Sequence, residues 1–179
     1  YDAAAAQTIL SETYYNLDLD GDGTGNKDSG GDITVTNDFT VEANAQRYRT
    51  KSFTTTVTGA TVIRSMLRIN NGGGIFDANG SFDATGATID FTNNGSLLLG
   101  STVTSLGTID ITDNTGTVKY DGTSAQTVHT NTYYNLTIEN SSTKTAGGNL
   151  NVDGALTTEA EASCVLDMST YKLNLAGNL

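Results

Sequence analysis

The sequence contains no proline, no tryptophan and only one cysteine, Cys164, among its 179 residues. A single cysteine excludes a disulfide within the chain, so stability must come from backbone hydrogen bonds and packing. The missing proline leaves the backbone amides able to donate, as the inner strands of a sheet require. No apolar run is long enough to cross a membrane and no signal peptide is visible, so we expect no membrane insertion.

Positive charge is also scarce. Nine lysine and arginine residues stand against 20 aspartates and glutamates, which gives a formal net charge of −11 and a pI of about 4.2. A chain this acidic is repelled by nucleic-acid phosphates and by anionic lipids. We therefore expect no nucleic-acid partner, whereas soluble cations are favoured ligands.

Threonine, glycine and asparagine are abundant, and amphipathic runs of good helix formers are scarce. Threonine, valine, isoleucine and tyrosine favour pleated strands, whereas glycine and asparagine favour tight turns. The composition therefore predicts an all-β protein.

A long repeat relates the two ends of the chain. Three segments recur 119 positions later: Tyr1-Asp2, Ala6-Gln7-Thr8 and Thr13-Tyr14-Tyr15-Asn16-Leu17 match Tyr120-Asp121, Ala125-Gln126-Thr127 and Thr132-Tyr133-Tyr134-Asn135-Leu136. A further match, of residues 30–35 with residues 147–152, lies 117 positions on, so the first copy has two extra residues in the loop between. We expect one continuous solenoid fragment over residues 1–179, with a long repeat at 1–119 and a partial second copy at 120–179.

A shorter period of about twenty residues lies inside the long repeat. The segment Thr88-Ile89-Asp90-Phe91-Thr92 recurs as Thr108-Ile109-Asp110-Ile111-Thr112. Each unit reads as two short alternating strands separated by an Asn/Gly corner. Such a unit cannot bury its apolar face alone, but stacked units share one interior. We predict a parallel β-helix (β-solenoid) with about twenty residues per coil, and tandem immunoglobulin-like β-sandwiches are the alternative.

Three segments of the second copy carry a resemblance to a known family. They are Gly116-Thr117-Val118-Lys119-Tyr120-Asp121-Gly122-Thr123, Ala125-Gln126-Thr127-Val128 and Tyr133-Tyr134-Asn135-Leu136-Thr137-Ile138. This pattern, which residues 1–19 share, resembles the repeat region of large secreted bacterial adhesins of the filamentous-haemagglutinin type. Residues 44–75 fit it poorly. The resemblance implies a parallel β-helix, export to the cell surface, and adhesive or scaffolding use.

Alternating carboxylates gather near the first corner of the chain. Three aspartates followed by a glycine match the first half of an EF-hand calcium loop, which needs closely spaced oxygen donors and a sharp turn. We predict a Ca²⁺ site with these ligands: Asp18, Asp20, Asp22, Thr24, Asn26 and Asp28. Ser29 stands where an EF-hand has glutamate, so the expected dissociation constant is about 10⁻⁴ to 10⁻³ M. A solvated acidic turn without metal is the alternative, because the second copy has lost this run of carboxylates.

Five of the nine basic residues gather in one segment: Arg47, Arg49, Lys51, Arg64 and Arg68. In one interpretation, Arg47 and Arg49 bind an anionic sugar or sulfate through bidentate hydrogen bonds, with Tyr48 as a stacking platform. In the other, the alternating basic residues form the outer face of a strand and pair with nearby acids.

No catalytic constellation is visible. Glycoside hydrolysis needs two carboxylates across a cleft, whereas the aspartates here recur at alternating polar positions of the repeat. His129 is the only histidine, and Leu10 stands at its position in the first copy. We therefore expect a protein that is not an enzyme.

Taken together, these features predict a secreted, structural or adhesive rod or filament segment of a bacterial surface protein. The alternative is a carbohydrate-binding or polysaccharide-acting β-helix module with surface glycans as ligands. Both Tyr1 and Leu179 lie inside recognisable repeat units. We therefore expect the coils to stack end to end on another copy of the chain, or to continue into further repeats.

Overall fold

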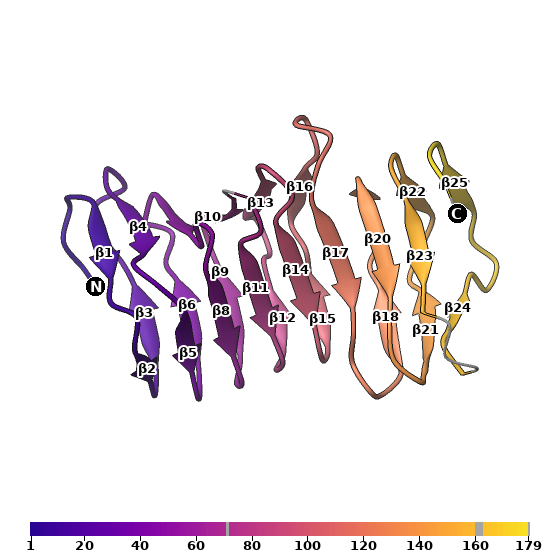
Figure 1. Cartoon of the computed structure of the whole chain (residues 1–179), viewed down its shortest axis with the longest axis horizontal. Helices are drawn as coiled ribbons and strands as arrows, with labels where there is room; N and C mark the ends of the chain where they lie inside the picture. The colour runs from indigo at the N-terminus through magenta and orange to yellow at the C-terminus, as the bar shows by residue number, and fades with distance from the viewer. Residues whose placement is uncertain (71, 160–162, 179) are drawn as a thin grey trace.

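The computed structural model describes residues 1–70, 72–159 and 163–178. The strands of this part of the chain wind into a parallel β-solenoid of about eight coils (Figure 1). No helix that could cross a membrane occurs among these residues. Every described pairing joins parallel strands. The predicted β-solenoid is therefore confirmed, and the immunoglobulin-like alternative, whose sheets are antiparallel, is wrong.

Three sheets, which we call A, B and C, form the sides of the first coils, and each coil gives one strand to each side. Sheet A contains β1 (Gln7–Ile9), β4 (Asn26–Ser29), β7 (Arg47–Arg49), β10 (Met66–Ile69), β13 (Thr88–Phe91) and β16 (Thr108–Asp110). Sheet B contains β2 (Thr13–Tyr14), β5 (Ile33–Val35), β8 (Thr54–Val57), β11 (Ile75–Ala78), β14 (Ser96–Leu99), β17 (Thr117–Tyr120), β20 (Asn135–Ile138) and β23 (Leu156–Thr158). Sheet C contains β3 (Leu17–Leu19), β6 (Phe39–Val41), β9 (Thr61–Ile63), β12 (Phe82–Asp83) and β15 (Val103–Ser105).

Two further sheets accompany the last strands of sheet B. Sheet D contains β18 (Gln126–Val128), β21 (Thr143–Ala146) and β24 (Val165–Asp167). Sheet E contains β19 (Thr132–Tyr133), β22 (Leu150–Val152) and β25 (Leu173–Leu175). Strand β18 contacts β15, so sheet D follows sheet C along the rod, and by chain order sheet E takes the side of sheet A.

Successive coils repeat at a spacing close to the predicted one. In the middle of sheet B, Ile75 pairs with Ser96 and Ser96 with Thr117, which is 21 residues in both cases. The spacing shortens to 18 residues between Thr117 and Asn135. Corners of different length absorb these differences, so the strands stay in register.

The number of strands in each coil differs from the prediction. The sequence pattern indicates two alternating strands per coil, whereas the structure has three. The strands of sheet C are short, and β12 spans only Phe82 and Asp83. Two residues are too few to show an alternating pattern, so a strand of this length is hidden in the sequence.

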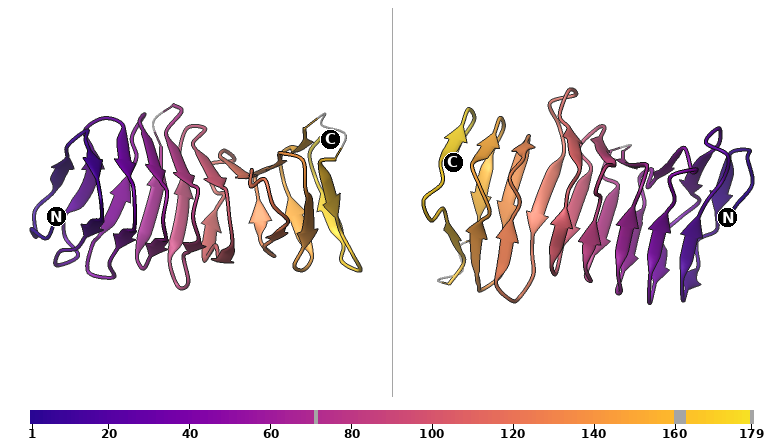
Figure 2. Two further views of the ribbon diagram at one scale, coloured as in Figure 1. Left: turned by 90° about the horizontal axis from the view of Figure 1, so that it is seen from below. Right: turned by 180° about the vertical axis from the view of Figure 1, so that it is seen from behind.

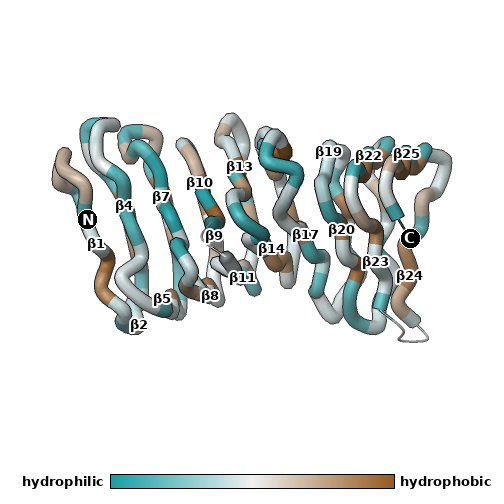
Figure 3. The backbone as a smooth tube through the Cα atoms, turned by 45° about the horizontal axis from the view of Figure 1, so that its top comes forward, coloured by the Kyte–Doolittle hydropathy of each residue, from teal (hydrophilic) through white to brown (hydrophobic). Residues whose placement is uncertain are grey.

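One apolar core runs inside the coils. Every second side chain of a strand points inward, as in β14, where Leu97 and Leu99 are fully buried. In the second to fourth coils, the ring of Phe39 lies 5.1 Å from that of Tyr48 and 5.3 Å from that of Phe76, measured between centroids. Apolar and polar residues interleave along the coils, as Figure 3 shows. The coils are thus held together by shared burial as well as by backbone hydrogen bonds.

The ladders of two sheets are interrupted after β17. Sheet B continues across this point, whereas sheets A and C end at β16 and β15 and sheets D and E begin at β18 and β19. We call this junction the seam, and Figure 2 shows the coils on either side of it.

The seam changes how the long repeat maps onto the coil. Strand β18 is the seventeenth strand after β1, and seventeen is not a multiple of three. Each strand of the second copy therefore lies one side back around the coil from its counterpart. Strand β3 belongs to sheet C, for example, while its counterpart β20 belongs to sheet B.

Candidate functional site

The predicted calcium ligands lie on two strands and the corner between them. Strand β3 ends at Leu19 and β4 begins at Asn26, so the corner is shorter than the predicted twelve-residue loop. Asp18 points outward from β3 and is exposed, and Asp28 points outward from β4. Gly23 has a φ of 84°, a left-handed conformation that glycine adopts without strain and that allows the sharp bend.

The carboxylates at the corner already accept hydrogen bonds from the corner itself. Asp20 Oδ1 accepts from the backbone amide of Gly21 at 2.7 Å. Asp22 Oδ1 accepts from the hydroxyl of Thr24 at 2.6 Å and from its backbone amide at 3.1 Å. These hydrogen bonds lower the pKa of the Asp22 carboxyl, so it is ionised at neutral pH.

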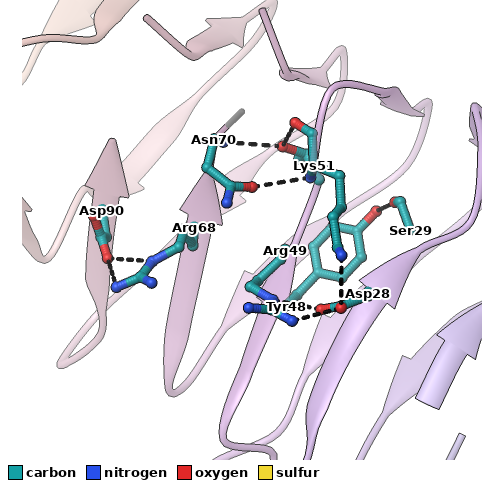
Figure 4. A network of polar contacts seen from close by, with 9 residues as sticks. Asp28, Ser29, Tyr48, Arg49, Lys51, Arg68, Asn70 and Asp90 are labelled. Carbon is teal, nitrogen blue, oxygen red and sulfur yellow. Dashed lines mark hydrogen bonds and ion pairs between the residues drawn. The ribbon is translucent and has the colours of Figure 1, made fainter. Parts of the chain in front are cut away.

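Asp28 has ionic partners on the neighbouring strand. Its carboxylate lies 2.5 Å from Arg49 Nε and 3.1 Å from Lys51 Nζ (Figure 4). Burial alone would raise the pKa of Asp28, but the hydrogen bonds from Arg49 and Lys51 outweigh burial and hold the pKa below its ordinary value. Asp28 is thus engaged by two basic residues, whereas Asp18, Asp20 and Asp22 form no ion pair among the described residues.

Within the described residues, no group of three or more histidine, cysteine, aspartate and glutamate side chains is placed to hold a metal ion. Asp18, Asp20 and Asp22 lie close in sequence, and their oxygens are not gathered around one point. The calcium site therefore stays a prediction that needs a direct titration.

The second predicted site, Arg47-Tyr48-Arg49, forms strand β7, and its central residue points inward. Tyr48 is fully buried, and its hydroxyl lies 2.5 Å from the hydroxyls of both Ser29 and Thr55. Burial raises its pKa to about 12, so the hydroxyl stays protonated. Tyr48 is therefore not available as a stacking platform for a sugar, because alternation along β7 directs its ring into the core.

Most of the basic residues pair with acids on the outer face of sheet A. The pairing register places Asp28, Arg49, Arg68 and Asp90 in one row across four strands. Arg49 pairs with Asp28, and Arg68 Nη2 lies 2.5 Å from Asp90 Oδ2 (Figure 4). This arrangement agrees with the interpretation of the basic segment as an outer strand face paired with acids.

Arg47 differs from its neighbours. It lies opposite Asn26, and both Arg47 Nε and Asn26 Oδ1 are buried atoms without a hydrogen-bond partner. Burial, followed by the nearby charges of Arg68 and Arg49, lowers the pKa of Arg47. No ion pair joins Arg47 to another described residue. Of the three residues of the predicted anion site, Arg47 is thus the one that is neither fully buried nor in an ion pair among the described residues.

Two buried lysines are structural residues that the sequence did not indicate. Lys27 and Lys144 are both fully buried and point into the coil from β4 and β21. They occupy the same position of the long repeat, directly before Asp28 or Thr145. A lysine shared by both copies at an inward position of a strand is the signal that could have identified them.

Side chains replace the backbone ladder at the seam. The bridging contacts are Gln126 Nε2 to the carbonyls of Leu99 and Ser101 (2.7 Å each), His129 Nε2 to the carbonyl of Val103 (3.1 Å) and Asn131 Nδ2 to the carbonyl of Gly107 (3.2 Å). The only histidine of the chain thus has a structural partner.

Two surface hollows of about 250 and 330 Å³ flank the seam. Threonines make up half of the lining residues of each hollow, with Gln126 in the first and His129 in the second. Neither is lined by a carboxylate, so neither offers the pair of acids that glycoside hydrolysis requires.

Comparisons of the chain with protein families, with curated proteins and with solved structures found no match. The relation to bacterial adhesins therefore rests on the sequence pattern alone.

Proposed function

We propose that the chain is a non-catalytic segment of an extracellular structural or adhesive rod of a bacterial surface protein. The observation that carries the proposal is sheet B, whose eight strands run through both copies of the long repeat. Each coil supplies backbone partners to the next and shares its core, so the rod lengthens with every added coil while its cross-section stays the same. Such a rod can hold a binding end away from its anchor.

The outer surface supports the same role. Thr13, Thr34 and Thr56 form one outward row of sheet B, and the outer row of sheet A carries the paired charges of Asp28 and Arg49. Polar and paired side chains keep the faces solvated and discourage sheets of neighbouring rods from packing together. Growth along the axis is thus favoured over lateral association.

Labelling of intact cells tests the proposal. Antibodies against the purified chain are expected to bind cells of the producing organism without permeabilisation, and electron micrographs of the natural protein are expected to show thin rods. In parallel, the purified chain is incubated with a panel of polysaccharides and the release of reducing ends is measured. Turnover of any polysaccharide would overturn the proposal of a non-catalytic rod.

Binding of an anionic glycan is the second candidate function, and the unpaired guanidinium of Arg47 favours it. An arginine without an internal acid partner, in a chain of net charge −11, is a natural contact for a sulfate or carboxylate group. An array of sulfated and uronic-acid glycans tests this function. We expect Arg47→Met to lower binding about tenfold, which corresponds to about 1.4 kcal/mol. Arg64→Met is the matched control, because Arg64 is exposed and pairs with Glu42.

Stabilisation of the rod by Ca²⁺ is a further part of the proposal. The exposed carboxylates of Asp18, on β3, and Asp22, in the corner between β3 and β4, support it. Ca²⁺ bound there would join β3 to the start of β4 and would neutralise part of the acidic surface.

A further inference from the structure

The hydrogen bonds around Tyr120 recur around Tyr1. The hydroxyls of Tyr120 and Tyr133 lie 3.3 Å apart at the inner side of the seam. In the first coil, the hydroxyls of Tyr1 and Tyr14 lie 3.1 Å apart. Each residue of one pair stands 119 positions before its counterpart in the other, so the long repeat is also a repeat of contacts.

The backbone of Tyr1 is also placed like that of Tyr120. Tyr120 is the last residue of β17, and its carbonyl accepts from the amide of Glu139 at 3.0 Å. The carbonyl of Tyr1 accepts from the amide of Asp20 at 2.8 Å, and the amino group of Tyr1 donates to the carbonyl of Asp18 at 3.0 Å. Tyr1 therefore lies beside β3 as Tyr120 lies beside β20, in the position of the last residue of a strand.

Of the three residues that bridge the seam, Gln126 has the same residue at its counterpart, Gln7. Leu10 stands at the position of His129, and Glu12 stands at the position of Asn131. Gln126 is only 8% exposed and holds two carbonyls of the preceding coil. Leu10, in contrast, is 57% exposed. Strands β1, β2 and β3 stand first in sheets A, B and C, so no described strand pairs along their outer edges, and Tyr1 alone bonds to β3 there.

We propose that the first coil is one half of a joint of the same kind as the seam, and that its occupant is a coil with the sequence pattern of residues 99–119. The inference rests on the proposed rod function and adds which surfaces meet. A strand that ends at Tyr1 pairs with β3, the Gln7 amide reaches backward to carbonyls of that coil, and Leu10 is covered by it. The rod thus has one side-chain joint in each long repeat.

A second copy of this chain is a poorer occupant. By chain order, the C-terminal strands β23, β24 and β25 correspond to β6, β7 and β8. In the first copy, those three strands are followed by β9, β10 and β11 through ordinary backbone ladders. By the repeat, the C-terminal edge is therefore expected to pair through a continuous backbone ladder. The N-terminal edge is expected to pair through side chains, as at the seam. The two edges do not match each other.

The test duplicates residues 99–119 directly before Tyr1, and a control chain carries the same residues in scrambled order. The readout is hydrogen exchange of the Asn16 amide, because its counterpart, the Asn135 amide, donates to the carbonyl of Gly116 at 3.2 Å. We expect exchange at Asn16 to slow at least about tenfold in the extended chain and to stay unchanged in the scrambled one. We also expect Gln7→Leu to lower the urea midpoint of the extended chain more than that of the original chain.

Three outcomes would contradict the joint. Exchange at Asn16 that is not slowed would do so, as would equal slowing by the scrambled segment. Ordered end-to-end oligomers of the original chain in sedimentation experiments would identify a second copy as the occupant. If the extended chain is folded but Asn16 is not protected, the joint fails and the rod proposal stands. Polysaccharide turnover, in contrast, would refute the non-catalytic role and leave the joint intact.

Discussion

Lys27 and Lys144 make the same contact in the two copies of the long repeat. Lys27 Nζ donates to the carbonyl of Ala3 at 2.6 Å, and Lys144 Nζ donates to the carbonyl of Gly122 at 2.5 Å. Ala3 and Gly122 are themselves equivalent positions, 119 residues apart. Both lysines are 0% exposed, so each carries a charge into the coil interior and uses it to fix the corner of the preceding coil. A buried ammonium is tolerated there because backbone carbonyls surround it.

Substitution of Lys144 tests this role. Lys144 Nζ also bonds to the carbonyl of Ser124 at 3.2 Å and to the hydroxyl of Ser142. Lys144→Met keeps the volume of the side chain but leaves these acceptors without a donor, so we expect a loss of about 2 kcal/mol in the free energy of unfolding, measured with urea. Lys172→Met is the control, because Lys172 is exposed, and we expect a change within about 0.5 kcal/mol. Equal effects of the two substitutions would contradict the structural role.

The pH dependence of the same pair of proteins gives a second test. Burial lowers the pKa of Lys144 below its ordinary value of 10.5. Between the lowered pKa and 10.5, the unfolded chain binds more protons than the folded one, so the stability of the wild type relative to Lys144→Met rises as the pH increases. Urea unfolding of both proteins at pH 8 and pH 10 measures the difference. A difference that stays constant or shrinks at pH 10 would show that burial does not disfavour the charged form.

Asp28 contributes stability through its ion pairs with Arg49 and Lys51. Its pKa is held below the ordinary value of 3.8, so its contribution is present above pH 3.8 and is lost as the pH falls through the lowered pKa. We expect Asp28→Asn to cost about 1 kcal/mol at pH 7, because the ion pair is partly solvated. The difference from wild type should disappear below the lowered pKa. Asp18→Asn, at an exposed outward position of β3, is the matched control and should leave the stability at pH 7 unchanged.

The sequence predicts the fold because its inward residues recur at the spacing of one coil. Ile89 and Ile109 are an example: they stand 20 positions apart and pair in register. The third side and the displacement of the second copy by one side were not predicted. Both depend on counting short strands such as β12, whose two residues carry no periodic signal.

The site was predicted less well because it depends on which face each side chain occupies. Arg-Tyr-Arg alternates, so Tyr48 must lie opposite its arginines, and pairing with Lys27 and Leu67 places it inside. Lys27 stands between two predicted calcium ligands, Asn26 and Asp28, but it points inward from β4. The sequence shows the alternation within a strand, but only the register between coils decides which half of it is buried.

Asp121 is expected to weaken the fold at neutral pH. Its Oδ1 is buried without a hydrogen-bond partner, and burial, together with the nearby charge of Asp77, raises its pKa above 3.8. A raised carboxyl pKa means that stability is lost as the pH rises from 3.8 through the raised pKa. Asp121→Asn removes the charge, so we expect a gain of about 1 kcal/mol at pH 7 and none below pH 3.8, measured by urea unfolding. Asp113→Asn is the control, because Asp113 is exposed in the turn that follows β16. A loss of stability at pH 7 in Asp121→Asn would contradict the prediction.

Calcium binding at the first corner is tested by calorimetric titration of the metal-free chain. If Asp18, Asp20 and Asp22 share an ion, we expect saturable heat with a dissociation constant of about 10⁻⁴ to 10⁻³ M and a higher melting temperature in millimolar Ca²⁺. Asp22→Asn should weaken binding about tenfold or more, whereas Asp153→Asn, far along the rod, should not change it. Asp28 is already paired with Arg49, so Asp28→Asn shows whether this residue is also a calcium ligand. Unchanged Ca²⁺ affinity in this variant would limit the site to the other carboxylates. Absence of heat at millimolar Ca²⁺ would leave a solvated acidic turn.

Gln126 is expected to hold the seam closed. Its Nε2 donates to two carbonyls of the preceding coil, and its Oε1 accepts from the amide of Gly122 at 2.9 Å. Gln126→Leu fills the same space but leaves these groups without partners, so we expect a loss of about 2 kcal/mol. Because sheets A and C end at the seam, the loss should be local, and limited proteolysis should cut the variant near residues 121–125 before the rest of the chain unfolds. Thr127→Ala, at an exposed position next to Gln126, should leave both the stability and the cleavage pattern unchanged. A weak joint must open before the coils on either side of it. Cleavage spread evenly along the Gln126→Leu chain would therefore contradict the prediction, because it would show that the two halves of the rod unfold as one unit.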